Sequence, residues 1–355
     1  MADISMPDPQ QAVIGGIGCH ADFGVVAALD PLGRVMGTES FPATGAGYRS
    51  AHTWLASFGP IAAVGVESTG SFGAALTRSL IDRGCGVIEV NQPHPHLRSR
   101  RGKNDAIDAE AAARKVLWGE ATAAATDTTG IVEAIRQLSV ARNNAVRARA
   151  AALCQIGDLL VTAPAVLRAQ LDTRRTLEGK AAVCARLRPD TDRLADPAQA
   201  AKAALRSLGR RIAQLGAEAV ELERRLDRLV AAAAPTTVSR LGCGTHHTAT
   251  LLVAAGHNID RLGSEASFAH LCAAAPVPAS SGRTSRHRLN LAPNRALHMI
   301  VIVRLRYCER TRSYTDRRLA QGKTKKEAIR CLKRFVAREL YRTLRGDLAT
   351  LTTRT

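Results

Sequence analysis

The chain of 355 residues has few aromatic side chains and no long apolar run. Phe, Trp and Tyr make up 3% of it, which argues against a protein that binds single strands by stacking bases on aromatic rings. No apolar run approaches the roughly 20 residues that a membrane-spanning helix needs, and residues 1–11 lack the basic and apolar parts of a secretory signal. We therefore expect a cytoplasmic protein without a membrane partner.

Closely spaced cysteines are also missing. The 8 cysteines are scattered, without a C-x-x-C pair and without metal-ligand spacing to a histidine. This distribution favours reduced, structural thiols over a zinc site or a disulfide framework.

Acidic residues are scarce relative to basic ones, at 31 Asp and Glu against 50 Lys and Arg, a formal charge of +19. The excess is concentrated in residues 236–355, which carry 22 basic and 7 acidic side chains, a net charge of +15. Such a surface indicates a polyanionic partner. Ribosomal and chromatin proteins share this bias, so charge predicts nucleic acid as the partner class but no reaction.

The first third of the chain alternates short apolar strands with segments of helical spacing. Strands are expected at 13–17, 25–29, 34–39, 62–66 and 87–90, and helices at 48–57, 71–83 and 104–118. Three strands, a helix, a strand, a helix, a strand and a helix is the element order of a ribonuclease H-like fold. The pattern therefore predicts an α/β domain with a mixed sheet and packed helices.

Two carboxylates stand three residues apart at the start of the helix expected at 104–118. On a helix Asp105 and Asp108 share one face and can hold a divalent cation through oxygen ligands. Glu67, at the end of the strand 62–66, could meet them at one edge of the sheet. The same residues also suit plain structural roles, with Asn104 or Asp105 capping the helix and Glu67 ending a strand.

The middle of the chain is helical. Residues 131–160 have helical spacing, and an apolar seam with alternating steps of three and four residues follows, formed by Leu205, Leu208, Ile212, Leu215, Ala219, Leu222, Leu226 and Leu229. A seam over more than three heptads favours a coiled coil, and so a dimer, over a helix packed only on its own domain. Residues 189–197 are expected to form the loop between the two helical arms.

Beyond Pro235 the composition shifts to Gly, Pro and Arg, and a mainly α-helical domain is expected. The segment 275–288 carries hydroxyl groups, including Ser280 and Ser281, among cations. It suits either a nucleophile that acts on a phosphodiester or a solvated basic loop. The segment 323–340 is expected to be an amphipathic basic helix, and the candidate nucleic-acid contacts of the two segments are Arg283, Arg286, Arg288, Lys323, Lys325 and Lys326.

These segments, in this order, resemble the DEDD-type transposases of the insertion sequence 110 family, and the resemblance covers nearly the whole chain. It rests on Val13–Ile17, Gly65–Gly70 and Arg101–Ala109 in the N-terminal part, and on Phe268–Cys272, Pro276–Gly282, Gly322–Lys325 and Arg338–Tyr341 in the C-terminal part.

The resemblance implies a RuvC-like domain over residues 11–125, a dimerising coiled coil over 126–234 and a C-terminal transposase domain over 235–350. It also implies acidic residues that bind Mg²⁺ and a serine that attacks DNA and forms a covalent intermediate. The implied partners are element-end and target DNA, a structured bridge RNA that selects them, and a second copy of the chain. Dimers are expected to pair into tetramers on the DNA of a bacterial nucleoid.

Carried over residue by residue, Glu67, Asp105 and Asp108 match three of the family's four acids. Ser281, directly before Gly282, best matches the serine, and Ser280 is the neighbouring alternative.

The chain departs from the family pattern at the first acid. The aspartate expected after Gly-Gly-apolar is replaced by Gly18, and Ala21 stands where a lysine is usual. Asp22 would lie about 13 Å from residue 18 along an extended strand, so it is a poor substitute unless the strand ends or bends there. The linker that follows the serine segment, residues 290–295, is also shorter than the family's.

These departures leave three readings of the function. The first is a bridge-RNA-guided recombinase weakened at Gly18. The second is an inactive remnant that only binds nucleic acid, and the third is a Holliday-junction-type nuclease that uses the acidic site alone.

Overall fold

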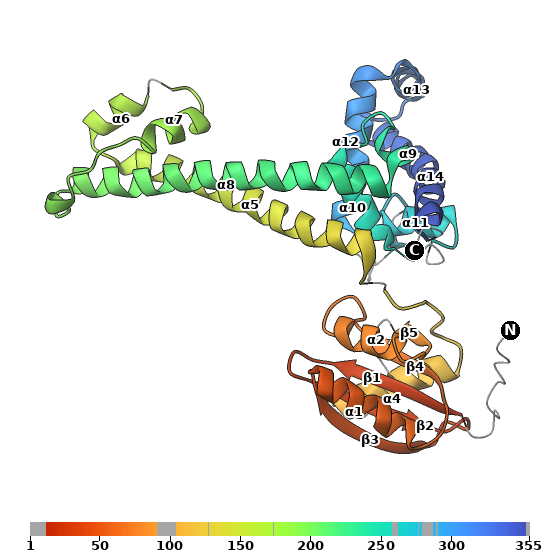
Figure 1. Cartoon of the computed structure of the whole chain (residues 1–355). Helices are drawn as coiled ribbons and strands as arrows, with labels where there is room; N and C mark the ends of the chain where they lie inside the picture. The colour runs from red at the N-terminus through yellow and green to blue at the C-terminus, as the bar shows by residue number, and fades with distance from the viewer. Residues whose placement is uncertain are drawn as a thin grey trace, which may run out of the picture. The chain divides into compact units, whose positions relative to one another are not determined.

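The fold is that of a computed structural model, which describes residues 12–90, 104–126, 128–172, 174–257, 262–275, 277–278, 287–288 and 290–352 (Figure 1). The chain divides into two compact units. Unit 1 consists of Met1–Glu133 and Ala255–Ser267, and unit 2 of Ala134–Ala254 and Phe268–Thr355. Both tryptophans, Trp54 and Trp118, belong to unit 1, so tryptophan fluorescence reports on that unit alone.

Unit 1 contains a five-stranded mixed sheet with helices. Its described elements up to residue 117 are β1 (Val13–Cys19), β2 (Phe23–Leu29), β3 (Val35–Pro42), α1 (Gly45–Ala56), β4 (Ile61–Glu67), α2 (Ala74–Ile81), β5 (Val87–Val90) and α4 (Asp105–Leu117). The strand order is β3-β2-β1-β4-β5, with β1–β2 and β2–β3 antiparallel and β1–β4 and β4–β5 parallel. The predicted mixed sheet with packed helices is confirmed.

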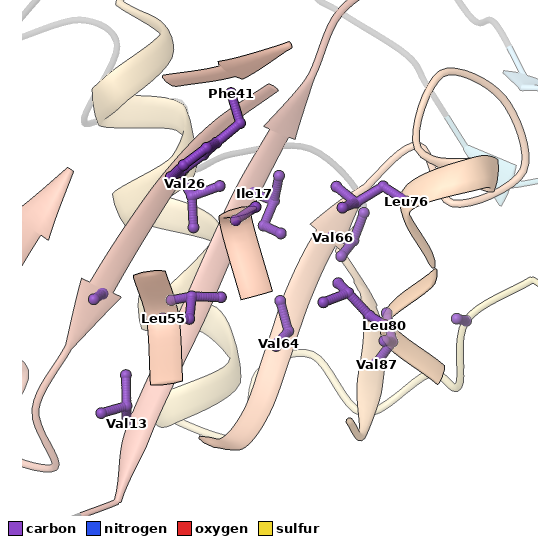
Figure 2. Packing of buried hydrophobic residues seen from close by; sticks show 13 residues of the cluster. Val13, Ile17, Val26, Phe41, Leu55, Val64, Val66, Leu76, Leu80 and Val87 are labelled. Atoms are coloured by element: carbon purple, nitrogen blue, oxygen red, sulfur yellow. The ribbon is translucent and has the colours of Figure 1, made fainter. Parts of the chain in front are cut away.

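The two faces of this sheet are covered by different helices, because successive strand residues point to opposite faces. On one face an apolar cluster joins the sheet to α1 and α2, and Figure 2 shows Ile17 and Val66 of the sheet with Leu55 of α1 and Leu80 of α2. The face toward α4 has smaller side chains, among them Ala27 and the helix residues Ala109 and Ala113.

Glycines bring α4 close to the sheet. A Cβ atom on Gly16 would overlap the carbonyl oxygen of Ala109 and the amide nitrogen of Ala113. A Cβ on Gly65 of β4 would come within 2.8 Å of the Ala112 carbonyl oxygen, closer than real Cβ contacts. The helix backbone therefore lies directly on β1 and β4, and its first turn is fixed near the ends of these strands.

Unit 2 is mainly α-helical. The elements from residue 130 onward are α5 (Gly130–Thr162), α6 (Ala165–Leu171), α7 (Leu177–Cys184), the 3-10 helix η1 (Thr191–Arg193), α8 (Pro197–Ala233), α9 (Pro235–Val238), α10 (Thr245–Ala255), α11 (Glu265–Leu271), β6 (Val277–Pro278), β7 (His287–Arg288), α12 (Leu291–Tyr307), α13 (Glu309–Ala320) and α14 (Lys325–Thr352). The first turn of α5, the last residue of α10 and the start of α11 belong to unit 1.

The two long helices α5 and α8 run antiparallel to each other (Figure 1). Arg142 of α5 donates to Glu223 of α8 across 2.6 Å, and an apolar cluster that includes Ile156 and Leu205 joins them to α6 and α7. The predicted seam on α8 is buried at Leu205, Ile212 and Leu226 but only partly buried at Leu208, Leu215, Ala219, Leu222 and Leu229. Its central part therefore remains accessible within a single chain.

A buried carboxylate joins the two ends of the C-terminal helical region. Asp347 of α14 is 5% exposed and caps the short helix α9. One of its oxygens accepts from the Thr237 amide at 2.9 Å and from the Thr237 hydroxyl at 2.7 Å, and the other accepts from the Thr236 amide at 3.2 Å. These bonds satisfy amide groups that the first turn of a helix leaves without a backbone partner.

We expect Asp347→Ala to destabilise unit 2 by about 3 kcal/mol, because it removes the acceptor of the buried Thr237 amide and hydroxyl and of the partly buried Thr236 amide. The control Asp347→Asn keeps one oxygen acceptor and should lose less stability than Asp347→Ala. In urea unfolding of the full chain, the circular dichroism transition at 222 nm should move to lower urea while the tryptophan transition of unit 1 stays in place. An unchanged circular dichroism midpoint in Asp347→Ala would contradict this expectation.

Within the described ranges, no helix is both long and apolar enough to cross a membrane. All eight cysteines are free thiols, as expected from their scattered positions.

Candidate functional site

The three candidate acids of unit 1 lie where β4 ends and α4 begins. Glu67 is the last residue of β4, and by the alternation of the strand it shares the α4 face with Gly65. Asp105 and Asp108 are in the first turn of α4, which Asn104 caps by accepting from the Ala106 amide at 3.0 Å. Asp108 is buried, with 7% of its surface exposed.

Gly18, at the position of the missing acid, faces the first turn of α4. A Cβ atom there would lie 3.7 Å from the Asp105 carbonyl oxygen and 3.9 Å from the Ala109 amide nitrogen, which are ordinary contact distances. The chain then reverses, since the His20 amide donates to the Phe23 carbonyl at 2.9 Å. Asp22 is exposed in this turn and outside the strand, so it does not continue the face on which Gly18 lies.

His20 also lies at this site, although the sequence did not predict it. Its Nε2 lies 3.3 Å from the Asp105 Oδ1, and its ring stacks on Phe23 with centroids 4.8 Å apart. The signal that could have found it is the strand alternation, since Gly16, Gly18 and His20 follow one another at steps of two.

Cys19 lies beside Glu67 at the same strand ends. Burial, and then the nearby Glu67 carboxylate, raise the pKa of the Cys19 thiol to about 12. The thiol therefore stays protonated at neutral pH and serves as a small apolar group rather than a nucleophile. Directly after Glu67, the exposed Ser68 has a left-handed backbone with φ 62°, which turns the chain sharply away from the strand.

The donor chemistry of this site suits a hard divalent cation, because Glu67, Asp105 and Asp108 offer carboxylate oxygens. The arrangement of these residues does not suit such an ion. Among residues that the structure describes, no three His, Cys, Asp or Glu side chains are grouped so that they could hold one ion. As placed, the residues do not fit the family's four-acid metal site. The shared metal site stays a prediction.

The candidate serines, Ser281 and Ser280, lie outside the described residues, as do Arg283 and Arg286. The described backbone on either side pairs as a short antiparallel ladder, with Val277 opposite Arg288. In the sequence the segment follows α11 and precedes α12.

One side chain ties these two helix ends together. Asn294, in the first turn of α12, donates to the carbonyl oxygens of Cys272 and Ala273 at 3.3 and 2.7 Å. Its own amide oxygen accepts from the Lys333 ammonium of α14 at 3.1 Å. Burial, and then the neighbouring Arg330, lower the pKa of Lys333. Sequence reasoning missed this pair, because nothing in the pattern indicates that the two residues meet.

The basic residues at the start of α14 are exposed. Lys323, Lys325 and Lys326 all point into solvent, as nucleic-acid contacts must. The opposite face of the helix is apolar, with Leu332, Val336 and Leu340 buried and Ile329 partly buried, which confirms the predicted inward face.

An ion pair joins α12 to α14. The Arg304 guanidinium donates two bonds to the Glu339 carboxylate, at 2.7 and 3.1 Å, and a third to the Leu241 carbonyl oxygen at 2.9 Å. The hydrogen bonds from Arg304, with its positive charge, lower the pKa of Glu339.

A carboxylate whose pKa is lowered by folding stabilises the protein above its unfolded pKa and loses that effect as the pH falls through the folded value. We therefore expect the unaltered chain to be more stable to urea than Glu339→Gln at pH 7, and the difference to shrink steadily below about pH 4.5. Added salt should also reduce this difference in stability, because Glu339 is 40% exposed and its ion pair is therefore screened. A difference between the two proteins that is independent of pH would contradict this role.

Acidic residues where sheet strands end at a helix, together with a strongly basic helical unit, are features expected of a protein that acts on nucleic acid. Residues 16–163 match the model of the DEDD-type transposase of the IS110 family, and residues 239–316 match that of the transposase IS116/IS110/IS902 family. The chain belongs to the IS110 family of transposases. No curated protein matches it.

Proposed function

We propose that this chain is an RNA-guided DNA recombinase that moves an insertion sequence by cleaving and exchanging strands through a covalent bond between Ser281 and DNA. The observation that carries the proposal is the meeting of the ends of β1 and β4 with the acidic first turn of α4, in a chain of the transposase family. The sheet order β3-β2-β1-β4-β5 supports a ribonuclease H-like, RuvC-like fold for the N-terminal domain.

The proposed chemistry balances without an external energy source. The Ser281 Oγ attacks the phosphorus of a phosphodiester and loses its proton, while the strand oxygen opposite leaves and becomes a hydroxyl. The phosphoserine ester preserves the bond energy, so the hydroxyl of another strand can attack it, join the strands and release the serine. A serine hydroxyl is a weak nucleophile unless a neighbouring group activates it.

A divalent cation, with Mg²⁺ as the expected ion, is part of the proposal. The described residues do not by themselves complete a ligand set for this ion.

The proposed partners follow from charge and from exposed apolar surface. The net charge of +15 in residues 236–355, with Lys323, Lys325 and Lys326 exposed, supports contact with DNA and with a structured bridge RNA through phosphates. The central part of the α8 seam, at Leu215, Ala219 and Leu222, is only partly buried within one chain, which supports a dimer that forms a coiled coil through this seam. We propose that such dimers pair on DNA in the bacterial nucleoid.

A second candidate function is favoured by Gly18. A chain without the first acid, whose remaining acids do not close a metal site, can keep its basic surface and its dimer and only bind nucleic acid. Retention of Glu67, Asp105, Asp108 and Ser281 favours the recombinase instead, since a long-inactive site should have lost more of them.

Covalent adduct formation decides between these functions. The purified chain is incubated with labelled element-end DNA, bridge RNA and Mg²⁺, and the adduct is resolved on a denaturing gel, in parallel with Gly18→Asp. Adduct from the unaltered chain supports the recombinase. Adduct from Gly18→Asp alone supports the binding remnant, and cleavage without adduct in either protein supports a nuclease that uses only the acidic site.

A further inference from the structure

An exposed aromatic ring lies in the turn that follows the acidic end of β4. Phe72 is 63% exposed, and its turn begins directly after Glu67 and ends where α2 begins at Ala74. We infer that the Phe72 ring stacks on one unpaired base of the DNA strand that the acidic site holds. The inference deepens the proposed function and rests on it, because it names a contact between the same site and its substrate.

The position of Phe72 carries the inference, because single exposed apolar side chains are common on protein surfaces. Within the same turn Thr69 is fully buried, and its hydroxyl accepts from the Thr126 amide at 3.1 Å. The turn is therefore anchored inward at Thr69 while the Phe72 ring remains in solvent. Other aromatic residues of unit 1 pack in or against the apolar cluster with α1 and α2, namely Phe41, Tyr48, Trp54 and Phe58.

The backbone next to Phe72 is fixed against the strand ends. The Gly73 amide donates to the Ser68 carbonyl at 3.2 Å. A Cβ atom on Gly73 would lie 3.0 Å from the Glu67 carbonyl oxygen and 3.1 Å from the Cys19 Sγ, so this backbone leaves little room for a side chain. A ring on a fixed backbone loses little conformational freedom on binding, which favours a preorganised contact.

The turn and the acidic helix lie at the same strand ends but lead to different faces of the sheet. Glu67 ends β4 on the α4 face, whereas α2, which follows the turn, packs on the opposite face. A DNA strand laid across the ends of β1 and β4 would therefore meet carboxylates on one side and the Phe72 ring on the other. The carboxylates suit the phosphate through a bound cation, and the ring offers a flat apolar surface to a base.

A single ring is enough for this task. Aromatic residues make up only 3% of the chain, which is too few for an extended stacking surface. One stacked base nevertheless fixes the register of a strand relative to the acidic site. Because every base has a flat face, stacking tolerates any sequence, so we expect Phe72 to position the strand without selecting its sequence.

The test compares two oligomers that carry the same phosphates and differ only in their bases. Fluorescently labelled oligothymidylate of about ten nucleotides, and an abasic oligomer of the same length, are titrated with the full-length protein in the absence of RNA. Fluorescence anisotropy gives the Kd of each. Phe72→Ala should reduce the preference for oligothymidylate by at least about fivefold and leave binding to the abasic oligomer unchanged, and Phe72→Trp should restore the preference.

Trp118→Ala is the matched control. Trp118 is 54% exposed and follows the C-terminal end of α4, away from its acidic first turn, so this variant should keep the full preference. An unchanged preference in Phe72→Ala, or an equal loss of binding to both oligomers, would overturn the inference, since the second result indicates a change in the fold or the charge. So would an equal loss of preference in Trp118→Ala.

A cross-linking measurement locates the stacked base directly. Oligothymidylate in which 5-iodouracil replaces thymine is irradiated in complex with the unaltered chain, and the modified peptides are identified by mass spectrometry. We expect a cross-link at Phe72 that is absent from Phe72→Ala. Cross-links confined to unit 2 would contradict the inference.

These outcomes are separate from strand exchange. A chain that forms a Ser281-dependent adduct but whose base preference does not depend on Phe72 would retain the proposed function and lose only this inference. A chain whose base preference depends on Phe72 but that never forms an adduct would lose the recombinase function and keep the contact with a base.

Discussion

Replacing Ser281 with alanine is expected to reduce covalent adduct formation by at least about 10⁴-fold, because it removes the atom that bonds to phosphorus. Ser280→Ala, one residue away in the same segment, is the matched control and should keep most of the adduct. The amount of DNA that migrates with the protein on a denaturing gel, measured against time, gives both rates. Loss of adduct in Ser280→Ala with retention in Ser281→Ala would assign the nucleophile to the neighbouring serine.

Binding must be measured alongside, because a variant that no longer binds nucleic acid also forms no adduct. Both serine variants should bind element-end DNA with the affinity of the unaltered chain, since the phosphate contacts proposed for the lysines of α14 are unchanged. Their binding should weaken steeply with salt, as expected for contacts to phosphates.

Gly16→Ala is expected to unfold unit 1 or to destabilise it by more than about 3 kcal/mol. The added methyl group would overlap backbone atoms of Ala109 and Ala113, which cannot rotate away as a side chain can, so α4 must move off the sheet. Gly18→Ala, two residues along the same face, is the matched control, because its methyl group would meet nothing closer than 3.7 Å.

Tryptophan fluorescence during urea unfolding measures this effect, since both tryptophans lie in unit 1. The midpoint should fall sharply in Gly16→Ala and stay close to that of the unaltered chain in Gly18→Ala. Similar midpoints in all three proteins would mean that α4 does not rest on β1 as described.

The sheet could be predicted because its strands are short apolar runs bounded by turn residues. The strand Val87–Val90 was placed at its observed bounds, while β3 extends three residues beyond the expected end to Pro42 because it pairs with β2 along its whole length. The helices α6 and α7 were not predicted, since short helices held by burial of residues such as Leu167 and Leu171 leave a weak periodic signal.

The part of the candidate site that depends on local sequence pattern could also be predicted. Spacing along one helix places Asp105 and Asp108 on one face, and the end of a strand places Glu67, so both follow from local pattern. The approach of His20 to Asp105 depends on a reversal of the chain after β1 and on glycines that admit α4, and the link between Asn294 and Lys333 joins helices far apart in the sequence. Such contacts between distant segments have no local signature.

The division of the chain into its two units has a consequence for inheritance. Unit 1 is not one continuous stretch, because Ala255–Ser267 returns to it after most of unit 2 has been traversed. A gene fragment that ends at residue 133 would therefore encode an incomplete unit 1, and one that begins at residue 134 would carry a segment foreign to unit 2. A single fusion between two genes could therefore not replace one whole unit with the corresponding unit of another protein. We expect the two units to have been inherited together during evolution.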